Sequence, residues 1–137
     1  MKSMCLNCFK VYASTRRTPC GSCGSKLVRI DELYIVIIKI LNQKGYTTTY
    51  CCSGHTYEKL PQSYILFGEG IKLPFIPEGY VIDYEAHTIL ESFKDIIEIR
   101  RDFYLKSYEN EIDLQKDILK SALVVLEWSQ LLPIYNN

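Results

Sequence analysis

The sequence has no long apolar run, although 47% of its 137 residues are hydrophobic. The longest run, Leu33 to Ile38, has only six residues, whereas a helix that crosses a bilayer needs about 20. The N-terminus, Met-Lys-Ser-Met-Cys, also lacks the apolar stretch of a signal peptide. We therefore expect a cytoplasmic protein with a buried core and no membrane partner.

Recognisable enzyme signatures are also missing. No glycine-rich nucleotide fingerprint and no catalytic pair of carboxylates is visible. The chain has only two histidines, His55 and His87. These absences favour a binding protein over an enzyme.

Acidic residues are absent from residues 1–30, which carry six lysines and arginines. The remaining residues carry ten basic and sixteen acidic side chains, so a net charge of zero hides a strong asymmetry. A basic N-terminal module either attracts phosphates or docks on the acidic remainder of the fold. Arg16 and Arg17 could contact a phosphate, or could belong to a solvated loop.

Four of the six cysteines form two Cys-x-x-Cys pairs, Cys5 with Cys8 and Cys20 with Cys23. Two such pairs supply four soft thiolates, which is the ligand set of a structural zinc site. Disulfides are the alternative, but a reducing compartment disfavours them. We predict a zinc ribbon over residues 1–30, with Zn²⁺ as a structural cofactor, and a second domain over residues 31–137.

The second domain is predicted to begin with a helix on a small antiparallel sheet. Asp31 is a suitable N-cap and Gly45 a suitable stop for a helix with apolar residues at helical spacing. β-Branched and aromatic residues then predict strands at 46–51, 63–67 and 79–84.

The C-terminal part is predicted to be an antiparallel helical hairpin, over residues 88–132, because apolar residues recur every three or four positions. Its helices would run from His87 to Lys106 and from Asn110 to Leu132. The last helix is more apolar than one packing seam needs, so it forms either the centre of the monomer or a homodimer seam. The predicted fold class is α+β.

The loop between the first two of these strands carries most of the polar chemistry. Cys51, Cys52 and His55 could bind a second metal, or could form a catalytic Cys–His pair. The favoured hypothesis is a recognition loop, in which Ser53, the Gly54 amide and His55 bind an anion or polar ligand. The predicted ligand-binding residues are Arg16 and Arg17 with Tyr50, Cys52, Ser53, Gly54, His55 and Glu58.

Cys5 to Cys23, Gly45 to His55 and Tyr64 to Phe67 together resemble small uncharacterised zinc-ribbon proteins of Gram-positive bacteria and their phages. Those proteins combine a Cys-x-x-Cys ribbon, a hydrophobic helix and a Cys-Cys-Ser-Gly-His motif. The resemblance implies a phage-associated protein but brings no established activity. Thr49 to Gly54 is also similar to a motif of the tRNA wybutosine-synthesising methyltransferase family, in which arginine replaces His55.

These observations predict a zinc-containing binding protein that recognises a nucleotide, a nucleic acid or a host protein through residues 50–58. The phage resemblance implies antagonism of a host defence, in the host cytoplasm. An enzyme acting on RNA or a nucleotide through His55, Cys52 and Glu58 is one alternative. A structural protein–protein adaptor is another.

Overall fold

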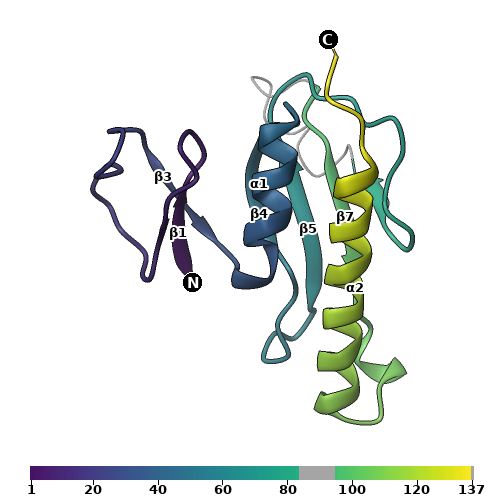
Figure 1. Cartoon of the computed structure of the whole chain (residues 1–137). Helices are drawn as coiled ribbons and strands as arrows, with labels where there is room; N and C mark the ends of the chain where they lie inside the picture. Colours follow the sequence, from purple (N-terminus) through teal and green to yellow (C-terminus); the bar gives the residue numbers. More distant parts are fainter. Residues whose placement is uncertain (84–94, 137) are drawn as a thin grey trace.

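The computed structural model describes residues 1–83 and 95–136, which form two antiparallel sheets and two α-helices (Figure 1). This arrangement confirms the α+β class. The smaller sheet has the order β2-β1-β3 and the larger one the order β4-β5-β7-β6. The strands are β1 (Lys2–Cys5), β2 (Val11–Tyr12), β3 (Leu27–Ile30), β4 (Thr48–Cys52), β5 (Gln62–Phe67), β6 (Val81–Asp83) and β7 (Glu98–Asp102).

The smaller sheet and its two turns make up an N-terminal module of residues 1–30. In this sheet the central strand β1 pairs antiparallel with β2 and with β3. Met4 and Ile30 are buried in the main core of the larger unit. The module therefore packs on the rest of the fold, and its description as a zinc ribbon and a separate domain stays a prediction.

The predicted helix after residue 30 is confirmed. Asp31 accepts a hydrogen bond from the backbone N–H of Leu33 at 3.1 Å and begins a short 3₁₀ turn, η1 (Glu32–Tyr34). This turn continues into α1 (Ile35–Gln43), whose Ile37, Ile38 and Leu41 are buried. Gly45 follows with φ +95°, a left-handed conformation that suits a helix end.

The predicted hairpin is not confirmed, because residues 98–102 form β7 rather than a helix. The first part of the predicted hairpin, up to residue 94, lies outside the described residues. β7 pairs with β5 from Gln62↔Asp102 to Leu66↔Glu98 and with β6 on its other edge. Pairing on both sides satisfies its backbone groups, and this long-range effect overrides a local helical pattern.

The C-terminal helix α2 (Glu111–Leu131) begins at Asn110, whose side chain accepts from the backbone N–H of Asp113 at 2.9 Å. At its other end, Lys44 Nζ donates to the carbonyls of Ser129, Gln130 and Leu132, at 2.6–2.9 Å. A cation there also complements the helix dipole. The helix buries Leu114, Ile118, Ser121, Ala122, Val125, Trp128 and Ser129.

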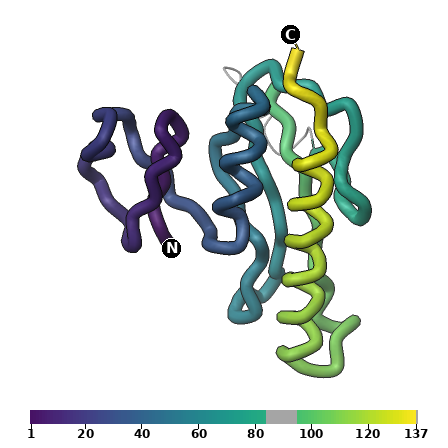
Figure 2. Tube along the Cα trace, viewed as in Figure 1, coloured from purple at the N-terminus to yellow at the C-terminus, as the bar shows by residue number. Residues whose placement is uncertain are grey.

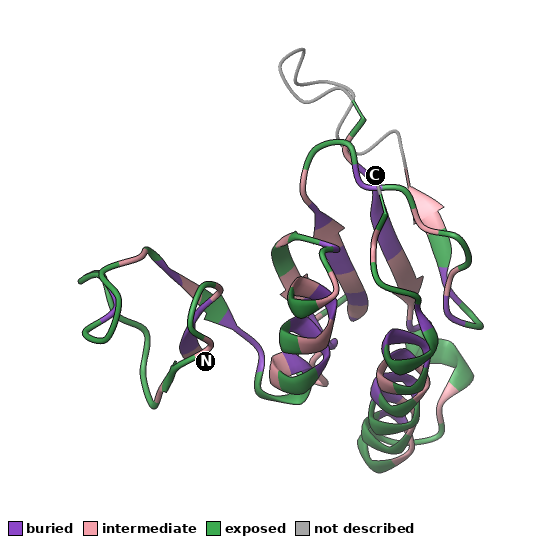
Figure 3. Cartoon of the chain, turned by 45° about the horizontal axis from the view of Figure 1, so that its top comes forward, coloured by how far each residue is buried: buried purple, intermediate pink, exposed green. Residues whose placement is uncertain are grey.

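Helices α1 and α2 lie side by side over one face of the larger sheet, as the two views of the trace show (Figures 2 and 3). One side of α2 is therefore the centre of the monomer. Its other side exposes Ile112, Leu119 and Leu123, so the homodimer stays a prediction. No helix in residues 1–83 and 95–136 combines the length and apolar character that crossing a membrane requires.

A buried hydroxyl network connects the two helices to the sheet. Tyr80 Oη lies 2.6 Å from Ser63 Oγ on β5 and 2.6 Å from Ser121 Oγ on α2. The Tyr34 hydroxyl also contacts Ser63 and Tyr80. Burial raises the pKa of Tyr34 well above its ordinary value, so this hydroxyl stays protonated.

Candidate metal centre and binding cleft

The four N-terminal cysteines converge at one point of the small module. Cys5 Sγ lies 3.4 Å from Cys23 Sγ, and Cys8 Sγ lies 3.6 Å from Cys20 Sγ. These distances exclude disulfides, whose sulfurs are about 2.05 Å apart. Ligand sulfurs around a tetrahedral zinc ion are about 3.8 Å apart. The predicted residues therefore form a group that could hold a metal ion.

Hydrogen-bond donors surround these sulfurs. The backbone N–H of Cys8 donates to Cys5 Sγ at 3.4 Å. A hydrogen bond from the Tyr12 hydroxyl lowers the pKa of Cys20 to about 7. Hydrogen bonds from the side chain and backbone of Ser25 lower the pKa of Cys23 to about 5. Such donors favour the thiolate, which is the form that binds metal.

The fourth sulfur, that of Cys8, differs from Cys20 and Cys23 because its pKa is raised rather than lowered. A backbone hydrogen bond at Lys10 lowers the pKa of Cys8, but desolvation and the three neighbouring sulfurs outweigh it and raise the pKa to about 11. Four sulfurs at these distances repel one another when all are ionised. A divalent cation at their centre removes that repulsion.

The predicted phosphate-binding arginines lie in the loop between the two cysteine pairs. The backbone N–H of Arg16 donates to Ser3 Oγ at 2.9 Å, and its guanidinium lies 4.4 Å from the Tyr12 ring centroid. Arg17 is exposed. Arg16 thus has contacts within its own module, and phosphate binding by either arginine stays a prediction.

A second group of potential ligands lies at the end of β4. Asp31, Cys52 and His55 each bring one ligand atom to a site where all three atoms lie within 4.8 Å of one another. His55 Nε2 is 3.2 Å from Asp31 Oδ2. Sequence reasoning found Cys52 and His55 but assigned Asp31 only to helix capping. Asp31 lies near Cys52 because the start of η1 lies beside the end of β4, and these two segments are distant in the sequence.

The Asp31 carboxylate is buried, with 5% of its area exposed, and several donors fix it in place. Oδ1 accepts from the backbone N–H of Leu33. Oδ2 accepts from the backbone N–H of Ser53 at 3.0 Å and from the Ser53 hydroxyl at 2.8 Å. Three donors therefore hold one carboxylate beside the imidazole of His55.

The backbone and hydroxyl donors that were predicted to bind an anion already donate hydrogen bonds within the protein. Ser53 directs both its amide and its hydroxyl to Asp31, and the Gly54 amide donates to Cys52 Sγ at 3.4 Å. An anion would have to replace these bonds and approach a buried carboxylate. The described conformation therefore does not support anion binding through Ser53 and Gly54.

Gly54 is required by the shape of this turn. Its φ is +91°, a region that side chains with a Cβ rarely adopt. A Cβ at this position would also lie 3.1 Å from Cε2 of Phe103. The turn thus fixes the direction in which Cys52 and His55 face.

Two buried atoms of the loop, His55 Nε2 and Glu58 Oε1, have no hydrogen-bond partner among the described residues. Burial raises the pKa of Cys52 to about 11 and that of Cys51 to about 12. The carboxylates of Glu58 and Asp31 add to the shift of Cys52. Without a metal ion, Cys52 is therefore a protonated thiol and a poor nucleophile.

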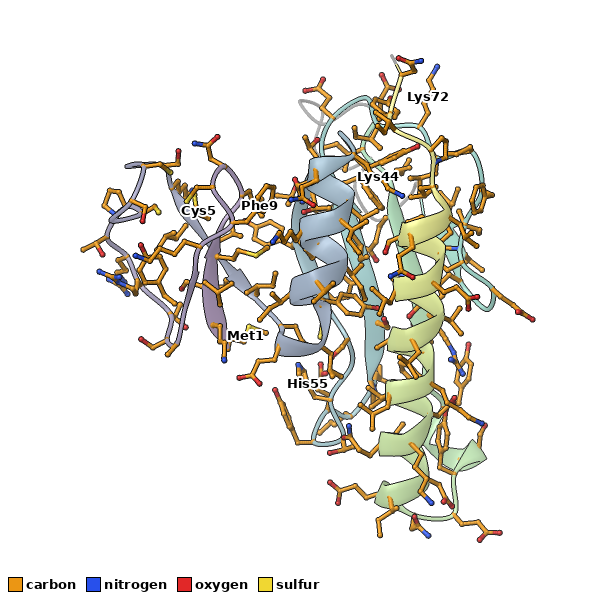
Figure 4. The ribbon with its side chains drawn as sticks, viewed as in Figure 1. Met1, Cys5, Phe9, Lys44, His55 and Lys72 are labelled. Carbon is orange, nitrogen blue, oxygen red and sulfur yellow. The ribbon has the colours of Figure 1, made fainter. Side chains whose placement is uncertain are left out.

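A cleft of about 380 Å³ opens beside this group and is lined by Asp31, Glu32 and His55 together with Met1 and Gln115. Figure 4 shows His55 on the side of the molecule where Met1 lies. The His55 ring stacks on that of Tyr57, with centroids 5.1 Å apart and planes inclined by 8°. Tyr57 is 81% exposed, so its outer face is accessible.

The structure brings only part of the predicted recognition loop to this cleft. Ser53, Gly54 and His55 line it, whereas Tyr50, Cys52 and Glu58 do not. Tyr57 was not predicted, although an aromatic residue two positions after a loop histidine was a visible signal. No family model, curated protein or solved structure matches the chain.

Proposed function

We propose that the protein is a zinc-containing binding protein that recognises the base of a nucleotide or of a single-stranded nucleic acid in the cleft beside His55. The observation that carries this proposal is the accessible Tyr57 ring, which extends the His55 stack at the mouth of the cleft. Any nucleobase has a face that can stack on such a ring.

Zinc is proposed for the four-cysteine site because four thiolates in a tetrahedral arrangement suit this ion best. The module's own apolar cluster contains only Cys5, Cys20 and Leu27, with Tyr12 packed against it. Such a small cluster cannot offset the entropy lost when about 30 residues become ordered. The ion is thus a structural cofactor.

The charges in the cleft favour a base over a phosphate as the group that is bound. Asp31 and Glu32 line the cleft, and Glu32 is exposed. Carboxylates accept hydrogen bonds from base amino and imino groups but repel phosphates. The phosphate of a nucleotide would therefore point out of the cleft.

A protein target is the second candidate, and Leu60 is the observation that favours it. Leu60 is 78% exposed on the same loop as Tyr57, so the tip of the loop presents both aromatic and aliphatic area. Tyrosine is enriched at protein–protein interfaces. Antagonism of a host defence is supported only by the resemblance to phage proteins.

The high pKa of Cys52 argues against an enzyme with a Cys–His nucleophile. A structural adaptor that binds no small ligand would give the cleft beside His55 no role. These two alternatives make different predictions for the experiment below, because only the nucleotide hypothesis requires Tyr57 to contact a base.

The test is isothermal titration calorimetry with a panel of ribonucleotides and short oligonucleotides. At least one should bind, and Tyr57→Ala should weaken binding by roughly 5- to 150-fold, because base stacking contributes about 1–3 kcal/mol. Tyr104→Ala is the matched control, since Tyr104 is also exposed but lies outside the cleft. No binding by any member of the panel, or equal losses in both variants, would contradict the proposal.

A further inference from the structure

The group formed by Asp31, Cys52 and His55 has the composition of a second metal site, separate from the four cysteines. It offers one oxygen, one sulfur and one nitrogen. The 3.2 Å between His55 Nε2 and Asp31 Oδ2 is close to the roughly 3.3 Å expected of two light ligands around a tetrahedral zinc ion. The ligand atoms of all three residues, including Cys52 Sγ, lie within 4.8 Å of one another.

We propose that Asp31, Cys52 and His55 bind one divalent transition-metal ion whose fourth coordination position opens to the cleft. Asp31 and His55 line the cleft, whereas Cys52 is buried and does not line it. The open position therefore faces the proposed ligand. This inference does not depend on what that ligand is.

The turn from Cys52 to His55 repeats a feature of the N-terminal site. Cys52 and His55 are three residues apart, as are Cys5 and Cys8. In both turns a backbone N–H donates to the sulfur of the first ligand at 3.4 Å, from Cys8 in one case and Gly54 in the other. An amide directed at a sulfur stabilises the thiolate that a metal requires.

His55 supplies the second, independent observation. Its Nε2 is buried and makes no hydrogen bond among the described residues, although Asp31 Oδ2 lies within 3.2 Å. A buried polar atom without a partner costs free energy unless another group satisfies it. A metal ion between the imidazole and the carboxylate would satisfy both.

The bonds around Asp31 are those expected of a metal ligand. Hydrogen bonds from Ser53 and Leu33 orient the carboxylate, which is how outer-shell groups hold ligands in metal sites. A carboxylate, a thiolate and a neutral imidazole together carry two negative charges, which a divalent ion balances. The sulfur favours Zn²⁺ or Co²⁺ over Mg²⁺ or Ca²⁺.

The test is the metal content of the intact chain after equilibration with excess Zn²⁺ and desalting, measured by native mass spectrometry. The wild type should retain two ions, and His55→Ala and Cys52→Ala one each. Cys51→Ala is the matched control, because it removes the adjacent thiol but no proposed ligand, and it should retain two. Tyr57→Ala should also retain two while losing ligand affinity, which separates this proposal from the proposed function.

A single ion in the wild type would overturn the proposal, as would two ions in His55→Ala. Equal losses in His55→Ala and Cys51→Ala would also overturn it. If Cys52→Ala fails to fold, His55→Ala decides alone, with circular dichroism confirming its fold. Loading with Co²⁺ provides a second readout, since the second equivalent should give a thiolate-to-cobalt absorption band that is absent from His55→Ala.

Discussion

The two cysteine-containing groups of this protein differ in what holds them together. The four-cysteine group lies in a module with a very small apolar cluster of its own, and two of its ligands, Cys8 and Cys23, are exposed. The Asp31–Cys52–His55 group lies where η1 meets the end of β4, beside the main core. Asp31 and Cys52 are buried there.

This difference predicts different effects of metal removal on the four-cysteine group and on the Asp31–Cys52–His55 group. The zinc ion that we propose for the N-terminal module would take the place of a hydrophobic core, so the fold of residues 1–30 should be lost when the ion is removed. At the second site the surrounding elements are held by their own core and hydrogen bonds, so only the occupancy of the site should change. The contacts of Met4 and Ile30 with the main core join the two regions.

The largest expected effect comes from Cys20→Ala. Structural zinc contributes about 10–16 kcal/mol in zinc-finger peptides, so loss of one thiolate should unfold much of residues 1–30 while α1 and α2 persist. Limited trypsinolysis should then cut rapidly after Arg29, which lies in the paired strand β3 of the folded module. Ser22→Ala, in the same turn, is the control and should resist cleavage as the wild type does. Equal cleavage of Cys20→Ala and Ser22→Ala would contradict the claim that the fold of residues 1–30 depends on its metal ligands.

Asp31→Ala should have an intermediate effect. It removes the acceptor of three hydrogen bonds and leaves the donors of Ser53 buried, so the free energy of unfolding should fall by about 2–4 kcal/mol. Chemical denaturation monitored by circular dichroism measures this change. The neighbouring Glu32→Ala should cost under about 0.5 kcal/mol, because Glu32 is exposed. A loss no larger than that of Glu32→Ala would show that the second site is not held by its own hydrogen bonds.

His55→Ala should have the smallest effect. With one equivalent of zinc, which the four cysteines take first, the variant should lose less than about 0.5 kcal/mol, because Nε2 makes no hydrogen bond with any residue that the structure describes. Excess zinc should stabilise the wild type further, by about 2.7 kcal/mol at a hundredfold excess over the dissociation constant, but not the variant. Thermal unfolding at the two zinc levels gives both numbers. Equal stabilisation of both proteins by excess zinc would contradict the account.

The sequence predicts the parts of this structure that depend on local spacing. The two Cys-x-x-Cys pairs, the helix after Asp31 and strands β4 and β5 are of this kind. β7 was predicted as a helix because Ile96, Ile97 and Phe103 fit a helical period. Its actual conformation depends on pairing with β5, more than thirty residues earlier.

The second site shows the same limit. Cys52 and His55 were visible as a candidate pair, but their third member, Asp31, approaches only when η1 packs against the end of β4. The direction of the Ser53 and Gly54 donors was equally hidden, because a Ser-Gly turn can present its amides outward or inward. Tertiary packing turned them toward Asp31 and Cys52.

Hydrogen–deuterium exchange of the zinc-loaded and chelated protein tests the contrast between the two regions most directly. Removal of zinc should raise exchange throughout residues 1–30, while the amides of α1, β5 and α2 keep their protection. Loss of protection in α1 and α2 to the same extent would contradict the account, since the core would then depend on the ion. Unchanged protection of residues 1–30 after chelation would contradict it equally, because the module would then fold without a metal.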